Sequence, residues 1–469
     1  MEGNMRSLSI IVFSLFFSWL LAFPFQGQIL LALAAKHGID SYSLAFGSTA
    51  AHFAGLFISG FLVKTIGAAK RLMLFSIVFC IGGSLLFFLP PSMLWYVSLV
   101  LMSFLSGACV AAWGFYFKKF TPSNERIKTA ADALIYSNIL MIVINASAIL
   151  LSPYLGLTLS MLMLATAFFL QLRLPGNSKK DMENRIQETK KDINPAKPLG
   201  FLCLFIAVIT INSGLMYQVV NPAFAHHKWL VSWYWAVPYI IALFIVRNLP
   251  PKTNRNYMLY IGIAMIGLSF IGFMMFDRSA PSYLFIDTLM LGACGVYDLF
   301  WWSILGEMLD FHDNPAKILG IGLSANVLGV LTGGMLGSII TASGIKNLSP
   351  SVLALVIVFI ILVLLPLLHR HLSNLLKNHA FLTALNEMTP IRQEETIDCF
   401  TTTGILTERE SEIAALLLKG RTYKMIAVEL YLSENTIKTH IKNIYSKFNV
   451  QSKSELIGLL MQKKPYINK

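Results

Sequence analysis

The stretch SPSVLALVIVFIILVLLPLL, residues 349–368, contains no charged side chain. An α-helix needs about 20 mostly apolar residues to cross the hydrocarbon core of a bilayer, and this stretch meets that requirement by itself. The chain of 469 residues shares the same bias, with 56% hydrophobic and 13% charged residues and a mean hydropathy of +0.65. Soluble domains average about 25% charged residues, so the composition predicts a polytopic membrane protein.

Further apolar stretches precede residues 349–368, and turns with proline, glycine or charged residues separate them. The polar segment 173–198 is the longest interruption of this series, and it divides the stretches into two groups of six. We therefore predict twelve membrane-spanning helices, at residues 8–34, 43–63, 71–89, 93–117, 129–151, 154–172, 199–223, 229–248, 257–276, 282–306, 318–342 and 349–368.

The distribution of Lys and Arg predicts the orientation of these helices. If the N-terminus is cytoplasmic, the cytoplasmic segments of the bundle hold 19 Lys and Arg residues and the outer loops hold 4. Such an excess of positive charge marks the cytoplasmic side of a membrane protein. An even number of spans returns the C-terminus to the same side. We predict a multi-pass protein of the bacterial cytoplasmic membrane with cytoplasmic N- and C-termini.

The loop after the second predicted span has the sequence GFLVKTIGAAKR, residues 60–71. At Gly60, Gly67 and the trailing basic pair it resembles the Gly-x-x-x-Asp-Arg-x-Gly-Arg-Arg motif of the major facilitator superfamily. Together with the six-plus-six arrangement, the resemblance extends over about residues 8–368. It implies a bundle of two halves with a central cavity between spans one, four, seven and ten.

The centre of this loop departs from the family motif. Lys64 and Thr65 stand where the family has an Asp-Arg pair that helps to gate the transport cycle. The departure argues against active transport. The eleventh predicted span is rich in glycine, which permits close helix approach, at Gly320, Gly322, Gly329, Gly333, Gly334 and Gly337.

Polar side chains inside a bilayer are costly and are candidates for function. Asp298 is the most informative, because no Lys or Arg lies in the middle of a predicted span to neutralise it. It either serves a ligand or a proton, or it is a neutral or hydrogen-bonded carboxyl in the packing. We expect His52 to be a packing histidine and Glu307, Asp310 and Asp313 to form a solvated cap. The candidate ligand pocket comprises Gln26, Trp113, Asn212, Gln218, Asp298 and Trp302.

The sequence contains no pattern typical of catalysis or of metal binding. Its five cysteines are scattered and form no Cys-x-x-Cys pair. It has no phosphate-binding loop and no Ser/His/Asp arrangement. We therefore predict no enzyme, no metal site and no cofactor.

The composition changes after Leu368. Leucines at helical spacing predict an amphipathic juxtamembrane helix at 369–388, and the polar residues 389–404 predict a linker. A helix then begins in the sequence LTERESEIAALLLKG, residues 406–420. In that helix Thr407 and Glu410 have the spacing of a capping box, and Gly420 is the predicted stop.

Three further helices are predicted at about 423–431, 434–447 and 452–463, with Ser433 as the cap of the middle one. That middle helix has an apolar stripe at Ile437, Ile441, Ile444 and Phe448. Its opposite side carries Asn435, Lys438, Thr439 and Lys442. Two helices, a tight turn and a polar, basic face predict a helix-turn-helix that enters the major groove of DNA. The last helix is expected to expose Leu456 and Leu460.

The pattern LTxRE…IA…LxLSxxTIKxHxxNIxxKFxV, residues 406–450, resembles the LuxR-type (NarL-type) DNA-binding domain along its whole length. The resemblance implies base contacts by Lys438, Thr439 and Lys442, and positions near the phosphates for Thr436, His440 and Asn443. It also implies a homodimer through helix 452–463. Lys438 and Lys442 lie one turn apart and can reach guanine or phosphate, although such a pair can also be a solvated basic face. Residues 405–469 carry 11 Lys and Arg against 6 Asp and Glu, which attracts phosphates.

These patterns together predict an all-α chain and a membrane-embedded one-component transcription regulator. The bundle senses a small molecule and controls DNA binding by the cytoplasmic domain. The alternative is a major-facilitator transporter with a regulatory DNA-binding tail. The expected partners are double-stranded DNA, the lipid bilayer, a small-molecule ligand and a second copy of the chain. The predicted segments are 1–172 (first half), 173–198 (cytoplasmic loop), 199–368 (second half), 369–404 (juxtamembrane helix and linker) and 405–469 (LuxR-type domain).

Overall fold

The computed structural model describes residues 2–176, 196–249, 255–343, 349–386, 405–419, 421, 423–450 and 453–462. Within these residues the regular structure is helical and contains no strand, which confirms the predicted all-α fold. The chain divides into two compact units, Met1–Lys179 with Leu199–Pro366, and Lys180–Pro198 with Leu367–Lys469.

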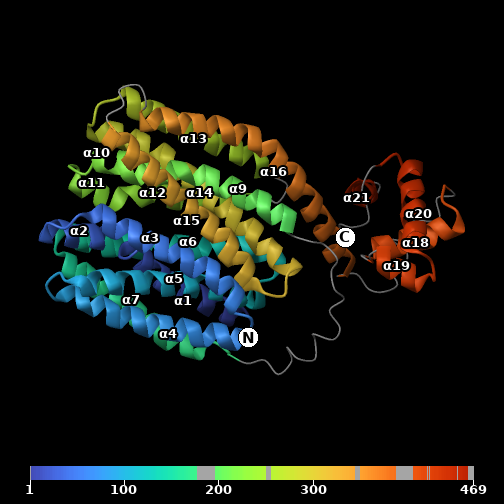
Figure 1. Cartoon of the computed structure of the whole chain (residues 1–469), viewed down its shortest axis with the longest axis horizontal. Helices are drawn as coiled ribbons and strands as arrows, with labels where there is room; N and C mark the ends of the chain where they lie inside the picture. The colour runs from blue at the N-terminus through green and yellow to red at the C-terminus, as the bar shows by residue number, and fades with distance from the viewer. Residues whose placement is uncertain are drawn as a thin grey trace. The chain divides into compact units, whose positions relative to one another are not determined.

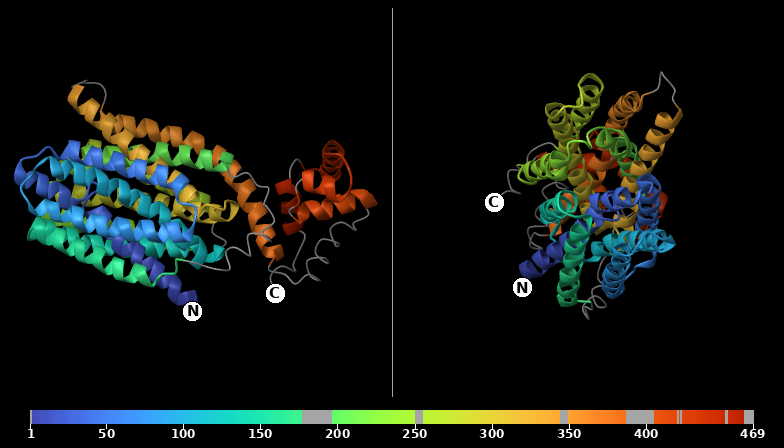
Figure 2. Two further views of the ribbon diagram at one scale, coloured as in Figure 1. Left: turned by 60° about the horizontal axis from the view of Figure 1, so that its bottom comes forward. Right: turned by 90° about the vertical axis from the view of Figure 1, so that its left-hand side faces the viewer.

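The first unit is a bundle of helices that lie side by side (Figures 1 and 2). Its described residues include twelve helices long and apolar enough to cross a membrane, as predicted. Those of the first half are α1 (Glu2–Ala22), α3 (Ser41–Leu62), α4 (Ile66–Leu85), α5 (Met93–Phe120), α6 (Arg126–Leu150) and α7 (Pro153–Arg173). Those of the second half are α9 (Ala196–Leu215) with its extension to Ala223, α11 (Lys228–Trp233) with α12 (Val237–Arg247), α13 (Arg255–Met275), α14 (Ala280–Met308), α15 (Pro315–Ser343) and α16 (Pro350–Asn386).

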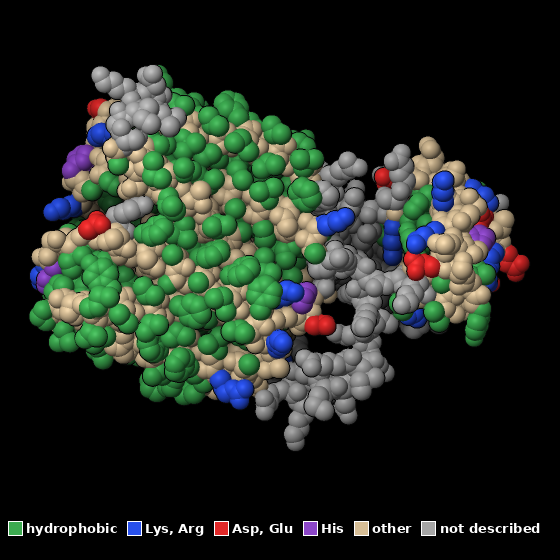
Figure 3. Space-filling view, in the orientation of Figure 1, with side chains coloured by type: hydrophobic (Ala, Val, Ile, Leu, Met, Phe, Trp, Pro, Cys, Tyr) green, Lys and Arg blue, Asp and Glu red, His purple; other side chains and the backbone are tan. Residues whose placement is uncertain are grey.

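The outer surface of the bundle is apolar. Figure 3 shows hydrophobic side chains over the visible face of the bundle, with Lys, Arg, Asp and Glu gathered near its two ends. Large apolar side chains such as Phe169, Phe359 and Val363 are exposed on the helices. In water such a surface would be unstable, whereas in lipid it needs no covering. The surface therefore agrees with the membrane assignment made from composition.

The first predicted span, 8–34, is wrong in its length. The structure ends α1 at Ala22 and starts a separate short helix, α2 (Gln28–His37). Pro24 lies in the turn between them, and Gln26 has a left-handed backbone with φ of 53°. Proline cannot continue the helical hydrogen bonds, so the apolar run contains two helices. Hydrophobicity alone carried no sign of this break.

The glycines of α15 bring it close to helices of both halves. A side chain at Gly333 would collide with the carbonyl oxygen of Ile211 on α9. A side chain at Gly320 would collide with that of Leu56 on α3. The prediction of close helix approach along this span is confirmed at these positions, and α15 packs against the first half as well as its own.

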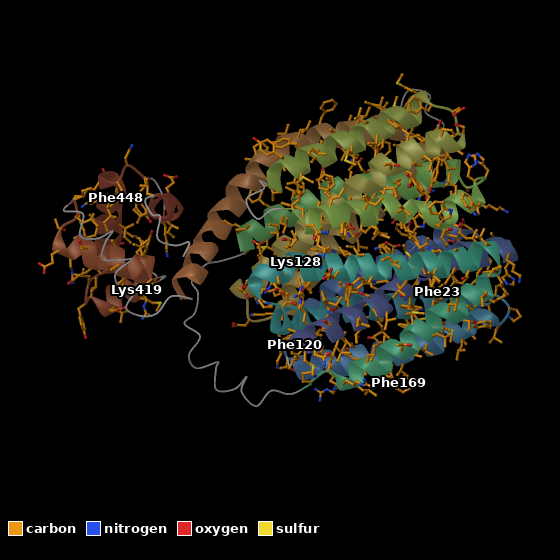
Figure 4. The ribbon with its side chains drawn as sticks, turned by 180° about the vertical axis from the view of Figure 1, so that it is seen from behind. Phe23, Phe120, Lys128, Phe169, Lys419 and Phe448 are labelled. Carbon is orange, nitrogen blue, oxygen red and sulfur yellow. The ribbon has the colours of Figure 1, made fainter. Side chains whose placement is uncertain are left out.

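Ion pairs join the two halves at the end of the bundle where α6 begins. Arg126 is paired with Asp310 at 2.7 Å and donates a second hydrogen bond to the carbonyl oxygen of Gly306. Arg247 at the end of α12 is paired with Asp132 at 2.6 Å. Asp310, which was expected in a solvated cap, is therefore the ion-pair partner of Arg126, although 184 residues separate the two in the sequence. Figure 4 labels Lys128 and Phe120 near this end.

The loop that resembles the major facilitator motif has a local structural role. Thr65 is the N-cap of α4, and its hydroxyl accepts a hydrogen bond from the amide of Ala68 at 3.1 Å. Lys64 is exposed. The loop is joined to the second half through the carbonyl oxygen of Gly60, which accepts a bond from Asn314 at 2.9 Å. Thr65 thus supplies a helix cap where the family has part of a gating pair.

The last span continues without a break into the segment beyond the membrane. α16 extends from Pro350 to Asn386, 37 residues, although Pro366 lies inside it. The predicted juxtamembrane helix, 369–388, is therefore mostly a continuation of the last span. The predicted linker and most of the loop 173–198 lie outside the described residues.

Beyond residue 404, the described residues of the second unit form four helices around one core. They are α18 (Glu408–Leu418), α19 (Tyr423–Glu429), α20 (Glu434–Lys447) and α21 (Lys453–Gln462). Thr407 and Glu410 form the predicted capping box, and Ser433 caps α20 by accepting from the amide of Thr436. The core contains three residues of the predicted stripe, and Phe448, just after α20, is partly buried against it. Residues of all four helices contribute, including Ile413, Leu417, Ile426, Ile437, Ile441, Ile444 and Leu456.

Arg409 and Glu410 join three of these helices. The Glu410 carboxylate accepts from the Lys447 ammonium at the end of α20, at 2.6 Å, and from the amide of Thr407. Arg409 donates to the carbonyl oxygen of Leu430, just after α19, at 2.8 Å. Burial of the Glu410 carboxyl raises its pKa, but the bonds from Lys447 and Thr407 outweigh this, and the pKa is lowered. The charged form of Glu410 therefore stabilises the packing of α18 against α20.

We expect Glu410→Gln to destabilise this domain by about 1–2 kcal/mol, because it weakens both the ion pair and the cap. A carboxyl whose pKa is lowered by folding stabilises above its unfolded value, about 4.3, and loses that effect as the pH falls through the folded value. Hydrogen-exchange protection of α18 and α20 in the full chain should therefore fall between pH 6 and pH 3 more steeply in the wild type than in Glu410→Gln. Glu412→Gln, which removes an exposed pair with Arg409, is the control. Equal pH dependence in all three proteins would contradict the assignment.

Candidate functional site

The first candidate site is the exposed face of α20. Ile437, Ile441 and Ile444 are buried in the domain core and so fix the rotation of the helix. The opposite face is accessible, with Lys438, Thr439, Lys442 and Asn443 exposed and Thr436 and His440 half-buried. The structure thus brings the six predicted DNA-binding residues together on or beside one polar surface of a single helix.

Local hydrogen bonds order this face. The Ser433 hydroxyl is 2.8 Å from that of Thr436, and the Thr439 hydroxyl donates to the carbonyl oxygen of Asn435. Lys438 is paired with Glu434, one turn before it, at 2.9 Å. Lys442 has no ion pair or hydrogen bond with a described residue and is exposed. Of the two lysines, Lys442 is therefore the one whose charge is free to meet a phosphate or a base.

The expected exposure of Leu456 on the last helix is wrong. Leu456 is fully buried in the domain core, next to Ile457 in the sequence, which is also buried. A small domain has few apolar residues with which to build a core, so the apolar side chains of its ten-residue helix α21 are needed in the core. The side chain of Leu460 lies outside the described part of the chain.

The second candidate site is a cavity inside the bundle, with a volume of about 140 Å³. Side chains from both halves line it, contributed by α1, α3, α5 and α6 of the first half and by α9, α12, α14 and α15 of the second, with neighbouring turns. Its polar lining residues are His52, Asn138, Ser213, Tyr217, Tyr239, Cys294, Asp298 and Asn326. Its aromatic lining also includes Phe17, Phe25, Trp235 and Trp302.

Asp298 is the only carboxylate among the lining residues, all of which are described. Its Oδ2 accepts a hydrogen bond from the Tyr239 hydroxyl at 2.6 Å. Its Oδ1 has no hydrogen-bond partner among the described residues. A carboxylate in a low-dielectric site is costly unless its oxygens are satisfied. One oxygen of Asp298 is thus satisfied by the protein and the other is available to the cavity.

The structure brings some of the predicted pocket residues together and leaves others apart. Asp298 and Trp302 both line the cavity. Trp113 does not, because it is buried against Phe13 and Phe117, with its indole nitrogen 3.0 Å from the Ser9 hydroxyl.

Asn212, Gln218 and Gln26 are also absent from the lining. Asn212 is buried, and both of its side-chain polar atoms have no partner among the described residues. Gln26 hydrogen-bonds to Thr49 from the turn after α1. A side chain at Gly337 would contact that of Gln218, which lies against α15.

Tyr239, Tyr217 and Trp235 line the cavity but were not selected from the sequence. Met216 and Tyr217 belong to a π-helical turn, Met216–Val220, which follows α9. Trp235 belongs to a 3-10 turn, Tyr234–Ala236, between α11 and α12. Such irregular turns recur at functional sites, and here each one aims an aromatic side chain at the cavity. The Pro238 near the second turn was the sequence signal that could have indicated it.

These features define a class of protein. A four-helix domain with a capped, polar and basic recognition helix has the architecture of a DNA-binding helix-turn-helix domain. It is joined, in one chain, to a twelve-helix bundle that has the composition of a membrane protein.

Comparisons with known proteins identify the family. The pattern of bacterial regulatory proteins of the luxR family matches residues 404–460. The spore germination protein GerE of Bacillus subtilis is 38% identical over 63 residues, which cover 13% of this chain and 85% of GerE. The nitrate/nitrite response regulator protein NarP of Escherichia coli is 40% identical over 61 residues, 13% of this chain and 28% of NarP. The chain belongs to the luxR family through this domain. Of NarP it spans less than a third.

The bundle resembles a solved transporter. The human organic anion transporter MFSD10 (TETRAN) aligns with a TM-score of 0.60 over 78% of this chain and 99% of that one. The two sequences are 13% identical, so the similarity concerns the fold alone. It confirms the predicted major-facilitator-like architecture. The chain is thus a LuxR-type DNA-binding domain fused to a major-facilitator-like membrane domain.

We expect Lys442→Ala to weaken binding of the full chain to a random-sequence duplex and to reduce the salt dependence of that binding. Each phosphate contact contributes about 0.9 to the slope of log K against log salt, so losing one should lower the slope by about 1. Fluorescence anisotropy at several KCl concentrations measures both quantities. Lys419→Ala, an exposed lysine outside α20, is the control. Equal slopes for wild type and Lys442→Ala would remove this residue from the DNA-binding face.

We expect Arg247→Gln to loosen the end of the bundle where α6 begins, because it breaks the pair with Asp132 that joins the halves. Cys294 lines the cavity and reports on its accessibility. Its alkylation by a small maleimide should be several-fold faster in Arg247→Gln, as expected for the loss of about 1 kcal/mol from a partly buried pair. Lys128→Gln, an exposed residue at the start of α6, is the control. An unchanged rate would show that this pair does not limit access.

Proposed function

We propose that the chain is a membrane-embedded one-component transcription regulator, in which a small molecule bound in the bundle cavity controls DNA binding by the LuxR-type domain. The observation that carries this proposal is the cavity itself. It lies in the bundle of a chain that also carries a DNA-binding domain, and both halves of the bundle contribute side chains to it, Asp298 among them.

A ligand in such a cavity can act on both halves at once. It shifts the bundle between conformations only if it binds one of them more tightly. α3 and α6 of the first half and α14 and α15 of the second all contribute to the lining, so movement of one half against the other changes the site. α16 continues the last span to Asn386, and the LuxR-type domain follows it in the sequence.

The orientation in the membrane and the homodimer on DNA are parts of the same proposal. The excess of Lys and Arg in one set of loops supports cytoplasmic N- and C-termini in a bacterial cytoplasmic membrane. The DNA-binding domain then lies on the side where DNA is. Binding to DNA as a homodimer is part of the proposal, since helix-turn-helix regulators commonly read paired half-sites. The chain is not proposed to be an enzyme.

Chromatin crosslinking of the full chain in its host tests the proposal. The wild type should give discrete peaks, and a Lys438→Ala/Lys442→Ala variant should give none, because base and phosphate contacts are lost together. Genes next to the peaks should change their expression on addition of an inducing compound, and Asp298→Ala should abolish that change while the peaks persist.

Two outcomes would contradict the proposal. If the peaks appear but no change in gene expression depends on Asp298, the bundle only anchors the DNA-binding domain to the membrane and senses no ligand at this site. No peaks in either protein would favour a transporter with a regulatory tail, a function that the similarity of the bundle to a transporter fold supports. Uptake into proteoliposomes by a chain truncated after residue 372 would then identify transport, in spite of Lys64 and Thr65.

A further inference from the structure

We propose that the bundle cavity binds an organic monocation, a protonated amine on a small aromatic body, with Asp298 as its counter-ion. This inference takes the cavity as the binding site from the proposed function. The class of ligand follows separately, from the chemistry of the residues that line the cavity.

The charge of the cavity is the first argument. None of the residues that line it is Lys or Arg, and Asp298 is the only Asp or Glu. His52 is hydrogen-bonded to Ser106 at 2.8 Å and forms no ion pair with Asp298. Within a membrane, a carboxylate without a cationic partner is retained at a high cost. A ligand that brings the missing positive charge removes this cost, whereas an anionic ligand increases it.

The geometry of Asp298 is the second argument. The Tyr239 hydroxyl occupies Oδ2 and fixes the carboxylate, while Oδ1 has no partner among the described residues. An ammonium group carries several N–H donors and no acceptor, so it matches an open carboxylate oxygen. Tyr239 is therefore a positioning residue, and Asp298 is the group that contacts the ligand. Asn138, Ser213 and Asn326 also line the cavity, and their side chains carry oxygens of the kind that accept N–H donors.

The size and walls of the cavity are the third argument. A volume of about 140 Å³ is close to that of engineered apolar cavities of about 150 Å³, which hold one benzene ring. Trp235, Trp302 and Tyr217 line the same space, and aromatic rings attract cations as well as aromatic groups. The fitting ligand is thus one ring with a short side chain that ends in an ammonium group.

A second carboxylate on the same helix provides a matched comparison. Asp287 lies three turns before Asp298 on α14, is buried and has an unpartnered Oδ2. It does not line the cavity. A mutation of Asp287 removes one acidic group from the membrane domain without altering the proposed site.

Protection of Cys294 from alkylation measures binding directly. Cys294 lines the cavity one turn before Asp298, while Cys80 and Cys109 are buried. In membranes that contain the full chain with Cys203→Ser and Cys399→Ser, the alkylation of Cys294 by N-ethylmaleimide is followed with two competing probes. They are phenethylammonium and 3-phenylpropionate, which are similar in size and opposite in charge.

Phenethylammonium should slow the alkylation and 3-phenylpropionate should not. Asp298→Asn should raise the concentration of phenethylammonium that gives half-protection by about tenfold or more, as the loss of one partner of a buried charge pair does. Asp287→Asn should leave that concentration unchanged, and Tyr239→Phe should raise it less than Asp298→Asn. Protection by 3-phenylpropionate at equal or lower concentration would overturn the proposal. So would protection by phenethylammonium that persists in Asp298→Asn.

This assay is independent of transcription. Protection that depends on Asp298, in a protein that gives no crosslinking peaks, would support the cation site and reject the regulator. Crosslinking peaks in a protein whose Cys294 is not protected by phenethylammonium would support the regulator and reject the cation site.

Discussion

Hydrocarbon offers the polypeptide backbone no hydrogen-bond partner, and most of this structure follows from that constraint. Twelve segments satisfy their backbone as helices, and their ionic side chains gather near the two ends of the bundle. There the charges find partners. Arg126 and Asp310, and Arg247 and Asp132, form pairs that join the two halves. Asp298 and Asp287 on α14 depart from this pattern, since neither is paired with a described cation. Asp298 lies among lining residues that include no Lys or Arg, and its hydrogen bond comes from Tyr239.

The same constraint explains where the helices become irregular. Unsatisfied backbone groups are tolerated at membrane depth only where protein or a polar cavity surrounds them. The π-helical turn Met216–Val220 and the 3-10 turn Tyr234–Ala236 both occur beside the cavity. Their backbone distortion has a local benefit, because it directs Tyr217 and Trp235 inward. These two irregular turns of the second half are therefore part of the wall of the candidate binding site.

The limits of the sequence can be traced to particular residues. Long apolar runs predicted the spans, and capping residues such as Thr407 and Ser433 predicted the helices of the LuxR-type domain, because both signals are local. Asp298 could be selected from the sequence because charge is rare in a span. Its partner Tyr239 could not, since 59 residues separate the two and tyrosine is common in membrane helices. For the same reason the pairing of Asp310 with Arg126, and the burial of Leu456 in the core, required the tertiary structure.

The preference for one conformation that a ligand must have can be compared with the energy of a charge pair between the ligand and Asp298. To reverse a two-state population from 1:99 to 99:1, a ligand must prefer one state by about 5.5 kcal/mol. When a ligand forms a charge pair in a desolvated site of one state and loses that pair in the other state, its binding free energies to the two states differ by about 2–5 kcal/mol. One ammonium on Asp298 therefore provides much of the required preference, if the arrangement in which α6 of the first half has moved away from α14 no longer holds the ammonium against Asp298. A lining built from both halves makes the affinity of the cavity depend on how the two halves are arranged. The last span, α16, belongs to the second half and continues to Asn386, and the DNA-binding domain follows it in the sequence.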